Sequence, residues 1–170
     1  AVIIKHLEDA AYQIDEAIRL CILKKKPVYI EVACNLAGLL ISHPHKRRFA
    51  TSLASDNEAL KQAVKSTVEL LSTAAKPVLV AGSKLKPEGA IESFTDLINK
   101  SDYAFASMPP AKGLISEAHP NYIGTYWGPV SSPGTAEIVE SANIYLFAGA
   151  RFTDYTTSGF TSLINPDKTI

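Results

Sequence analysis

The chain has 170 residues, which is enough for one medium-sized domain or for one domain and part of another. Basic and acidic residues both number 17, so the formal net charge is zero and a basic, nucleic-acid-binding surface is not expected. No apolar run approaches the roughly 20 residues of a membrane span, and Lys5, Glu8 and Asp9 come too early for a signal peptide.

The first 38 residues predict a helix followed by a strand. Apolar residues recur at helical spacing between residues 9 and 24, and Pro27 ends that helix after three lysines. Residues 28–32 (VYIEV) are mostly β-branched or aromatic and predict a short strand. We therefore expect residues 1–38 to be a helix–strand remnant of one α/β domain, with apolar faces left exposed.

Two cysteines, Cys21 and Cys34, occur in this region. We expect both to be buried free thiols, because Cys21 lies on the apolar side of the helix and Cys34 follows an apolar strand. Free thiols are typical of a reducing compartment, so we expect a cytoplasmic protein.

Residues 39–56 show no periodicity and predict a linker between two domains. Their charged run, residues 43–48 (HPHKRR), is typical of a solvated loop. A zinc site made by Cys34, His43 and His45 is an alternative, but the spacing matches no common zinc pattern and a fourth ligand is missing.

Residues 57–170 alternate between amphipathic helices and continuous apolar strands. Ser55 and Glu58 have the spacing of a capping box at the start of the first helix, and Ser132 is the expected N-cap of the last. The expected strands are residues 76–82, 103–108 and 144–149, and a further strand begins at residue 168. Residues 87–100 are expected to form a helix between the first two strands. Residues 109–128 are expected to be irregular. This alternation predicts an α/β domain with a Rossmann-like, doubly wound parallel sheet.

The turns that follow the three strands are the candidate sites, because open α/β sheets bind ligands at the carboxyl ends of their strands. They are residues 82–84, 108–113 and 149–155. None of these turns contains G-x-G-x-x-G or a Walker A loop. Their glycines are explained by the geometry of turns after buried strands. A nucleotide-binding site stays open as an alternative. The aromatic loop 118–128 is expected to pack rather than to bind a ligand, and His119 has neither a Ser or Cys nucleophile nor a carboxylate pair beside it.

The sequence also has the character of a piece cut from a longer protein. It starts at Ala1, its only methionine is Met108, and residues 167–170 (DKTI) have the character of a strand entry. We therefore expect that the residues responsible for the chemistry can lie outside this chain.

Several segments resemble the thiamine-diphosphate-dependent 2-oxo acid decarboxylases, and pyruvate decarboxylases in particular. Residues 26–36 (KPVYIEVACNL) are similar to the end of that family's pyrimidine-binding domain, and residues 77–85 (PVLVAGSKL) to the first strand and turn of its central domain. The match continues in the same order along the chain with residues 111–113 (AKG), 119–128 (HPNYIGTYWG), 140–143 (ESAN) and 152–159 (FTDYTTSG).

This resemblance implies a full enzyme of three α/β domains that uses thiamine diphosphate and Mg²⁺ to convert pyruvate to acetaldehyde and CO₂, as in fermentation. It also implies a homo-oligomer, a dimer or a tetramer, with active sites between subunits. The family's activating glutamate, paired histidines and diphosphate-binding motif fall outside this segment, so no catalytic, cofactor-binding or metal-binding residue is expected in it. The isolated segment is accordingly expected to be an inactive scaffold.

Among the residues present, only Tyr155 matches a family position that resembles a wall of the substrate pocket. A bulky ring there would favour a small 2-oxo acid such as pyruvate, although plain packing explains the residue equally well. Two sister activities stay open: indolepyruvate or phenylpyruvate decarboxylation, and acetolactate synthesis by an enzyme that binds FAD on its central domain. A stand-alone nucleotide-binding or regulatory module is the alternative of another class.

Overall fold

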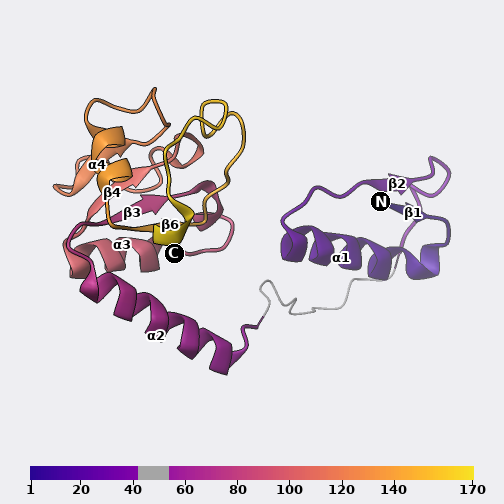
Figure 1. The fold of residues 1–170 in the computed structure, drawn as a ribbon. Coiled ribbons are helices and arrows are strands. Elements are labelled where there is room, and N and C mark those ends of the chain that lie inside the picture. Colours follow the sequence, from indigo (N-terminus) through magenta and orange to yellow (C-terminus); the bar gives the residue numbers. More distant parts are fainter. Residues whose placement is uncertain (42–53) are drawn as a thin grey trace. The chain divides into compact units, whose positions relative to one another are not determined.

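The computed structural model describes residues 1–41 and 54–170 (Figure 1). The chain divides into two compact units, Ala1–Ser55 and Asp56–Ile170, and each is described by itself. None of the helices in these described ranges is long and apolar enough to cross a membrane.

The first unit is a strand–helix–strand arrangement. Strands β1 (Val2–Ile4) and β2 (Ile30–Val32) pair in parallel, and helix α1 (Leu7–Lys24) connects them. Lys25 ends α1 in the left-handed region with φ of 52°. The sequence prediction missed β1, since three apolar residues are too few to show a period, and it began the second strand two residues early.

Apolar side chains of the first unit are largely exposed, as predicted. Among the exposed ones are Ile3, Tyr29, Val32, Leu39 and Leu40. The expectation that both cysteines are buried is wrong, because Cys34 lies in the turn after β2 and is exposed, while Cys21 is half-buried. Both are free thiols, as expected.

The second unit contains a four-stranded parallel sheet with strand order β5-β4-β3-β6. In chain order its elements are α2 (Asn57–Thr73), β3 (Pro77–Ala81), α3 (Ile91–Ser101), β4 (Ala104–Ser107), β5 (Tyr122–Thr125), α4 (Thr135–Ser141) and β6 (Ile144–Ala148), with short 3₁₀ turns at Ser83–Leu85, Pro109–Ala111 and Pro166–Lys168. Thr169 adds a parallel bridge beside Tyr145 of β6, where the sequence predicted the entry to a strand.

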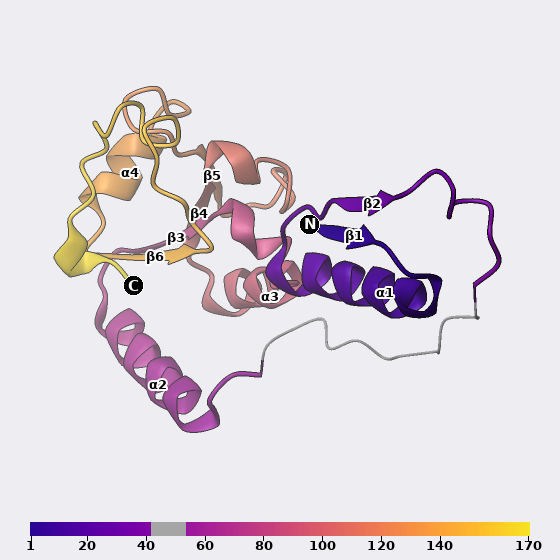
Figure 2. The same cartoon turned by 90° about the vertical axis from the view of Figure 1, so that its right-hand side faces the viewer.

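The two faces of this sheet carry separate cores, because successive side chains of a strand point to opposite faces. Val78 and Val80 of β3 pack with Val139 of α4 on one face. Leu79 packs on the other face with Phe94 of α3. Figures 1 and 2 accordingly show α3 and α4 on opposite sides of the sheet. The predicted doubly wound α/β architecture is therefore confirmed.

Three local predictions in the second unit are wrong. Residues 109–128 are not wholly irregular, because they include strand β5. The alternation of apolar and polar residues typical of a strand is hidden there by Gly124, at φ of 122°, and by an irregular register with β4. Asp56, not Ser55, caps α2 by accepting a hydrogen bond from Ala59 N at 2.8 Å. Helix α4 begins at Thr135 after Gly134, and Ser132 accepts a hydrogen bond from Thr125 N at 3.0 Å instead of capping the helix.

Helix α2 has the predicted apolar stripe, but the stripe is mostly exposed. Leu60, Val64 and Val68 are each at least half exposed, and only Leu71, near the end of the helix, is buried. Tyr103 anchors that end by donating its hydroxyl hydrogen to Leu71 O at 3.3 Å.

Candidate functional site

The carboxyl ends of β3, β4, β5 and β6 lie along one edge of the sheet, because all four strands are parallel. The chain runs outward from β3 through β4 to β5 and then returns to β6 on the other side of β3. The order therefore reverses between β3 and β6, and such a switch point is where open α/β sheets bind their ligands. All three turns singled out from the sequence lie on this edge.

The switch point is filled by backbone. The N–H of Gly82, after β3, donates to Ala148 O at 2.8 Å, and Lys84 N donates to Gly149 O at 3.0 Å. A Cβ atom on Gly82 would overlap the carbonyl group of Gly149, so glycine is what lets the two turns approach this closely. The pyrophosphate of a nucleotide would need this space, and the packing therefore argues against a nucleotide or FAD site here.

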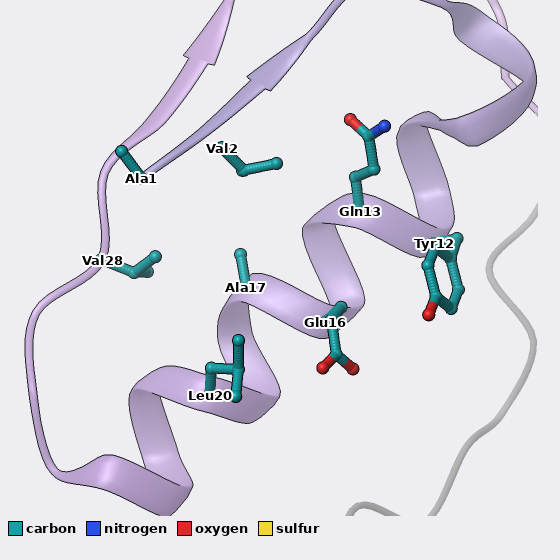
Figure 3. Close-up of a pocket in the computed structure, with 8 residues that line it drawn as sticks. All are labelled: Ala1, Val2, Tyr12, Gln13, Glu16, Ala17, Leu20 and Val28. Atoms are coloured by element: carbon teal, nitrogen blue, oxygen red, sulfur yellow. The ribbon is translucent and has the colours of Figure 1, made fainter.

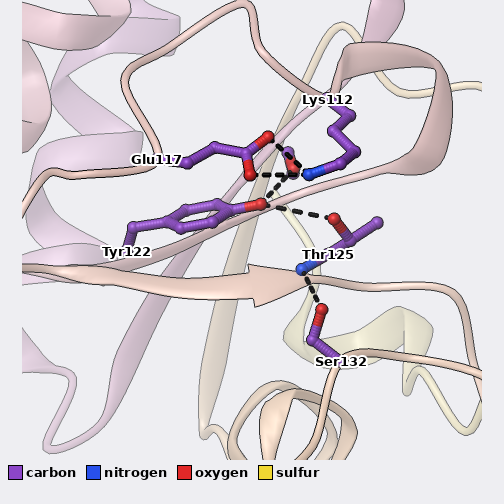
Figure 4. A network of polar contacts seen from close by, with 6 residues as sticks. Lys112, Glu117, Tyr122, Thr125 and Ser132 are labelled. Atoms are coloured by element: carbon purple, nitrogen blue, oxygen red, sulfur yellow. Dashed lines mark hydrogen bonds and ion pairs between the residues drawn. The ribbon is translucent and has the colours of Figure 1, made fainter.

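Polar groups join the ends of β4 and β5 in a network (Figure 4). The Tyr122 hydroxyl lies 2.9 Å from Ser107 Oγ and 3.3 Å from Thr125 Oγ1. Beside it, Lys112 Nζ contacts both carboxylate oxygens of Glu117, at 2.6 and 2.8 Å. Hydrogen bonding to Glu117 raises the pKa of the Lys112 ammonium, which therefore stays charged. Each group is satisfied by a neighbour, so the network stabilises the strand ends.

His119 is held in place by structural contacts. Its Nδ1 accepts a hydrogen bond from Asn121 N at 3.1 Å, and its Nε2 lies 3.0 Å from Asn99 Oδ1. The ring packs edge-on against Phe105, with centroids 5.4 Å apart. Tyr126 of the same loop is fully buried in the core. The aromatic loop therefore packs against the sheet, as the sequence predicted.

Tyr155, the predicted wall of a substrate pocket, lies in the segment after β6, and the residue is 62% exposed. Its ring packs against Trp127 with centroids 5.2 Å apart, and the Trp127 indole N–H donates to the Tyr155 carbonyl. Trp127 belongs to the aromatic loop 118–128, so this loop meets the segment after β6 at Tyr155. Its role in a pocket remains a prediction.

Glu140 is a residue that the sequence analysis missed. Its Oε1 accepts hydrogen bonds from the Tyr126 hydroxyl at 2.9 Å and from Leu163 N at 3.0 Å. Burial raises the pKa of Tyr126 well above its ordinary value near 10, and the hydrogen bond to Glu140 raises it further. Glu140 thus ties α4 to the loop that carries Tyr155. No local signal could have shown this, because the contacts span 14 and 23 residues.

Metal ligands do not gather in the described residues, where no group of three or more His, Cys, Asp or Glu side chains could hold an ion. His43 and His45 of the zinc alternative lie outside the described residues, so only Cys34 can be placed, and it is exposed.

A pocket of about 210 Å³ lies in the first unit, between α1 and the start of β1 (Figure 3). Apolar side chains, among them Val2, Ala17 and Leu20, make up most of its lining. Its one carboxylate, Glu16, is paired with Arg19 at 2.6 Å. The pocket therefore presents no set of groups for catalysis.

The fold and the strand-end geometry define a Rossmann-like α/β domain whose switch point is closed by its own backbone. The sequence signature of the family described as "Thiamine pyrophosphate enzyme, central domain" matches residues 64–170. The chain therefore belongs to the thiamine pyrophosphate enzymes, and residues 64–170 match their central domain.

The similarity extends beyond the central domain. Along 99% of the chain, pyruvate decarboxylase 2 of Oryza sativa subsp. japonica is 49% identical, pyruvate decarboxylase 1 of Zea mays 47% and pyruvate decarboxylase 1 of Arabidopsis thaliana 45%. The chain spans 28% of the length of each of these relatives. These matches confirm the resemblance on which the sequence analysis relied.

Proposed function

We propose that this chain is the segment of a pyruvate decarboxylase that runs from the end of the pyrimidine-binding domain, residues 1–38, through a linker, residues 39–56, into the central domain, residues 57–170. One observation carries the proposal: similarity to plant pyruvate decarboxylases covers 99% of the chain and so includes both compact units. The division of the chain between Ser55 and Asp56 is consistent with the proposed end of the linker.

The complete enzyme would convert pyruvate to acetaldehyde and CO₂ with thiamine diphosphate and Mg²⁺, as a cytoplasmic dimer or tetramer. Thiamine diphosphate supplies the electron sink for such a decarboxylation. The described residues do not fit either cofactor, because they bring no carboxylate cluster together and because backbone fills the space between Gly82 and Gly149. We assign both cofactors to parts of the enzyme outside this chain, and expect the isolated chain to be an inactive scaffold.

Tyr155 is the one residue of this chain to which we assign a contact with substrate. Trp127 supports one side of the ring, while the residue stays 62% exposed and retains surface for a ligand. A ring at the wall of a pocket limits its width, so the methyl group of pyruvate fits better than an indole or phenyl group.

A substrate panel tests this proposal in the full-length protein that carries the chain. We expect turnover of pyruvate to exceed turnover of indolepyruvate and phenylpyruvate, with no acetolactate as the main product. Tyr155→Ala should raise the ratio of kcat/KM for phenylpyruvate over pyruvate by about tenfold, while Tyr155→Phe, which keeps the ring, should leave the ratio near that of the wild type. An unchanged ratio in Tyr155→Ala removes the role of Tyr155, and a preference of the wild type for indolepyruvate overturns the assigned substrate.

A further inference from the structure

Tyr155 lies in the segment of residues 151–163, after β6, and this segment is held together mainly by hydrogen bonds of its own threonines. Thr156 Oγ1 donates to Arg151 O at 2.6 Å, and Thr157 Oγ1 donates to Thr153 O at 2.6 Å. Residues 158–160 all have φ between 51° and 74°, a region that non-glycine residues rarely adopt. These contacts shape the segment but do not attach it to the sheet. Its attachments must therefore decide where Tyr155 lies.

Trp127 provides such an attachment, because it contacts both the backbone and the side chain of Tyr155. Its indole N–H donates to the Tyr155 carbonyl, which fixes the backbone of that residue. Its ring lies against the Tyr155 ring, with centroids 5.2 Å apart and planes inclined at 51°, which limits the rotamers that the side chain can adopt. An indole can do both because it combines a large ring with one N–H donor.

The turn that contains Trp127 is itself fixed. Trp127 N donates to Ser131 Oγ at 2.8 Å, and Ser131 Oγ donates to Gly128 O at 2.6 Å. Gly128 has φ of 54°, and a Cβ atom there would lie 3.0 Å from Ser162 Oγ, so this turn packs closely on the far end of the segment. The attachment is therefore made from a closed turn after β5, which anchors it to the sheet.

We infer that Trp127 is a positioning residue, which sets the place of the Tyr155 ring and through it the width of the substrate pocket. The inference rests on the proposed function, because Tyr155 must face substrate for Trp127 to affect selectivity. Glu140 supports the same segment at its other end through Leu163 N, whereas Trp127 contacts the backbone and the ring of Tyr155 directly. Trp127 is thus the residue whose replacement should act on Tyr155 most directly.

Two substitutions in the full-length protein separate the two contacts. Trp127→Phe keeps an aromatic ring and removes the N–H donor, whereas Trp127→Leu removes both. Loss of one hydrogen bond should raise KM for pyruvate about three- to tenfold in Trp127→Phe, with kcat within about twofold of the wild type, and Trp127→Leu should show the larger effect. Both should raise the selectivity for phenylpyruvate over pyruvate. Tyr103→Phe, which loses a single hydroxyl contact to Leu71, is the matched control and should change neither value.

Amide hydrogen exchange gives a readout that does not depend on substrate. Exchange at residues 153–159 should be faster in Trp127→Phe than in the wild type, because the segment opens more readily when one attachment is lost. In a Tyr155→Ala background, Trp127→Phe should no longer change selectivity, since residues that act through one another are not additive.

The outcomes separate this inference from the proposed function. Faster exchange in Trp127→Phe, with a selectivity change that disappears in the Tyr155→Ala background, supports it. Unchanged exchange at residues 153–159 overturns it whatever the kinetics show, and so does a selectivity change that persists without the Tyr155 ring. If Tyr155→Ala alone leaves selectivity unchanged while exchange is faster in Trp127→Phe, Trp127 positions the segment but the pocket role of Tyr155 is wrong.

Discussion

Replacing Gly82 with alanine tests how closely the sheet is packed at its switch point. The added Cβ would lie well inside 3.4 Å of the Gly149 carbonyl group and of Ala150 Cα, and all these neighbours are backbone. The turns would have to separate, which strains the hydrogen bonds from Gly82 N to Ala148 O and from Lys84 N to Gly149 O. Overpacking costs about 1–3 kcal/mol, and each weakened hydrogen bond adds about 0.5–1.5 kcal/mol. We expect the variant to lose about 3 kcal/mol of the free energy of unfolding.

Urea denaturation followed by tryptophan fluorescence measures this loss in the second unit, because Trp127 is the only tryptophan in the chain. With an m-value of about 1.5 kcal/mol/M, the midpoint should fall by roughly 2 M. Gly134→Ala is the control, since Gly134 has φ of 79° but nothing within 4 Å of an added Cβ, so that only a backbone cost of about 1–2 kcal/mol applies. A loss in Gly82→Ala no larger than in Gly134→Ala would refute the argument that backbone fills the switch point.

Two further predictions concern buried polar groups of the second unit. Burial and the hydrogen bond to Glu140 raise the pKa of Tyr126 in the folded state, so its stabilising contribution is complete below pH 10 and is lost as pH rises toward the folded-state pKa. Urea denaturation at pH 8, 10 and 11 should show the free energy of unfolding falling above pH 10, by up to about 1.4 kcal/mol per pH unit from this group. Tyr126→Phe should lack this slope, and the same slope in that variant would disprove the assignment. Thr135 is fully buried and its hydroxyl donates to Ile123 O. Thr135→Val leaves that carbonyl without its donor and should lower the free energy of unfolding by about 1–3 kcal/mol. A loss below about 0.5 kcal/mol in the same urea titration would show that the contact contributes little.

The sheet of the second unit could be predicted because its strands are buried on both faces. A strand such as Pro77–Ala81 is apolar throughout, and a flanking helix on each face then follows from the alternation of elements. Strand β5 could not be predicted in this way, since it has four residues, includes Gly124 and is half-buried along its whole length. Its place in the sheet comes from pairing with β4, which periodicity does not record.

Burial within the predicted elements was harder to foresee. The stripe of α2 has helical spacing, which predicts a helix correctly, but spacing does not say what covers the stripe, and Val64 and Val68 are more than half exposed here. The error on Cys34 has the same origin, because an apolar strand precedes it but the residue itself lies in a turn. Sequence periodicity thus predicted the helices and strands more reliably than it predicted which residues cover their apolar faces.

The candidate site could be located only in part. The strand ends indicated one edge of the sheet, and the singled-out turns do lie there, while the family resemblance singled out Tyr155. Trp127 and Glu140, which hold the segment around Tyr155, were not assigned this role, because their partners lie 23 to 28 residues along the chain. Contacts over such a distance depend on the folded arrangement of the loops after β5 and β6.

The central claim is that this chain is a scaffold segment of a pyruvate decarboxylase. The most direct measurement is acetaldehyde release from pyruvate, with thiamine diphosphate and Mg²⁺ present, by the full-length protein and by the 170-residue chain in parallel. We predict that the full-length protein releases acetaldehyde and that the isolated chain releases none above the rate without protein. Release by the isolated chain, or none by a folded full-length protein, would contradict the account.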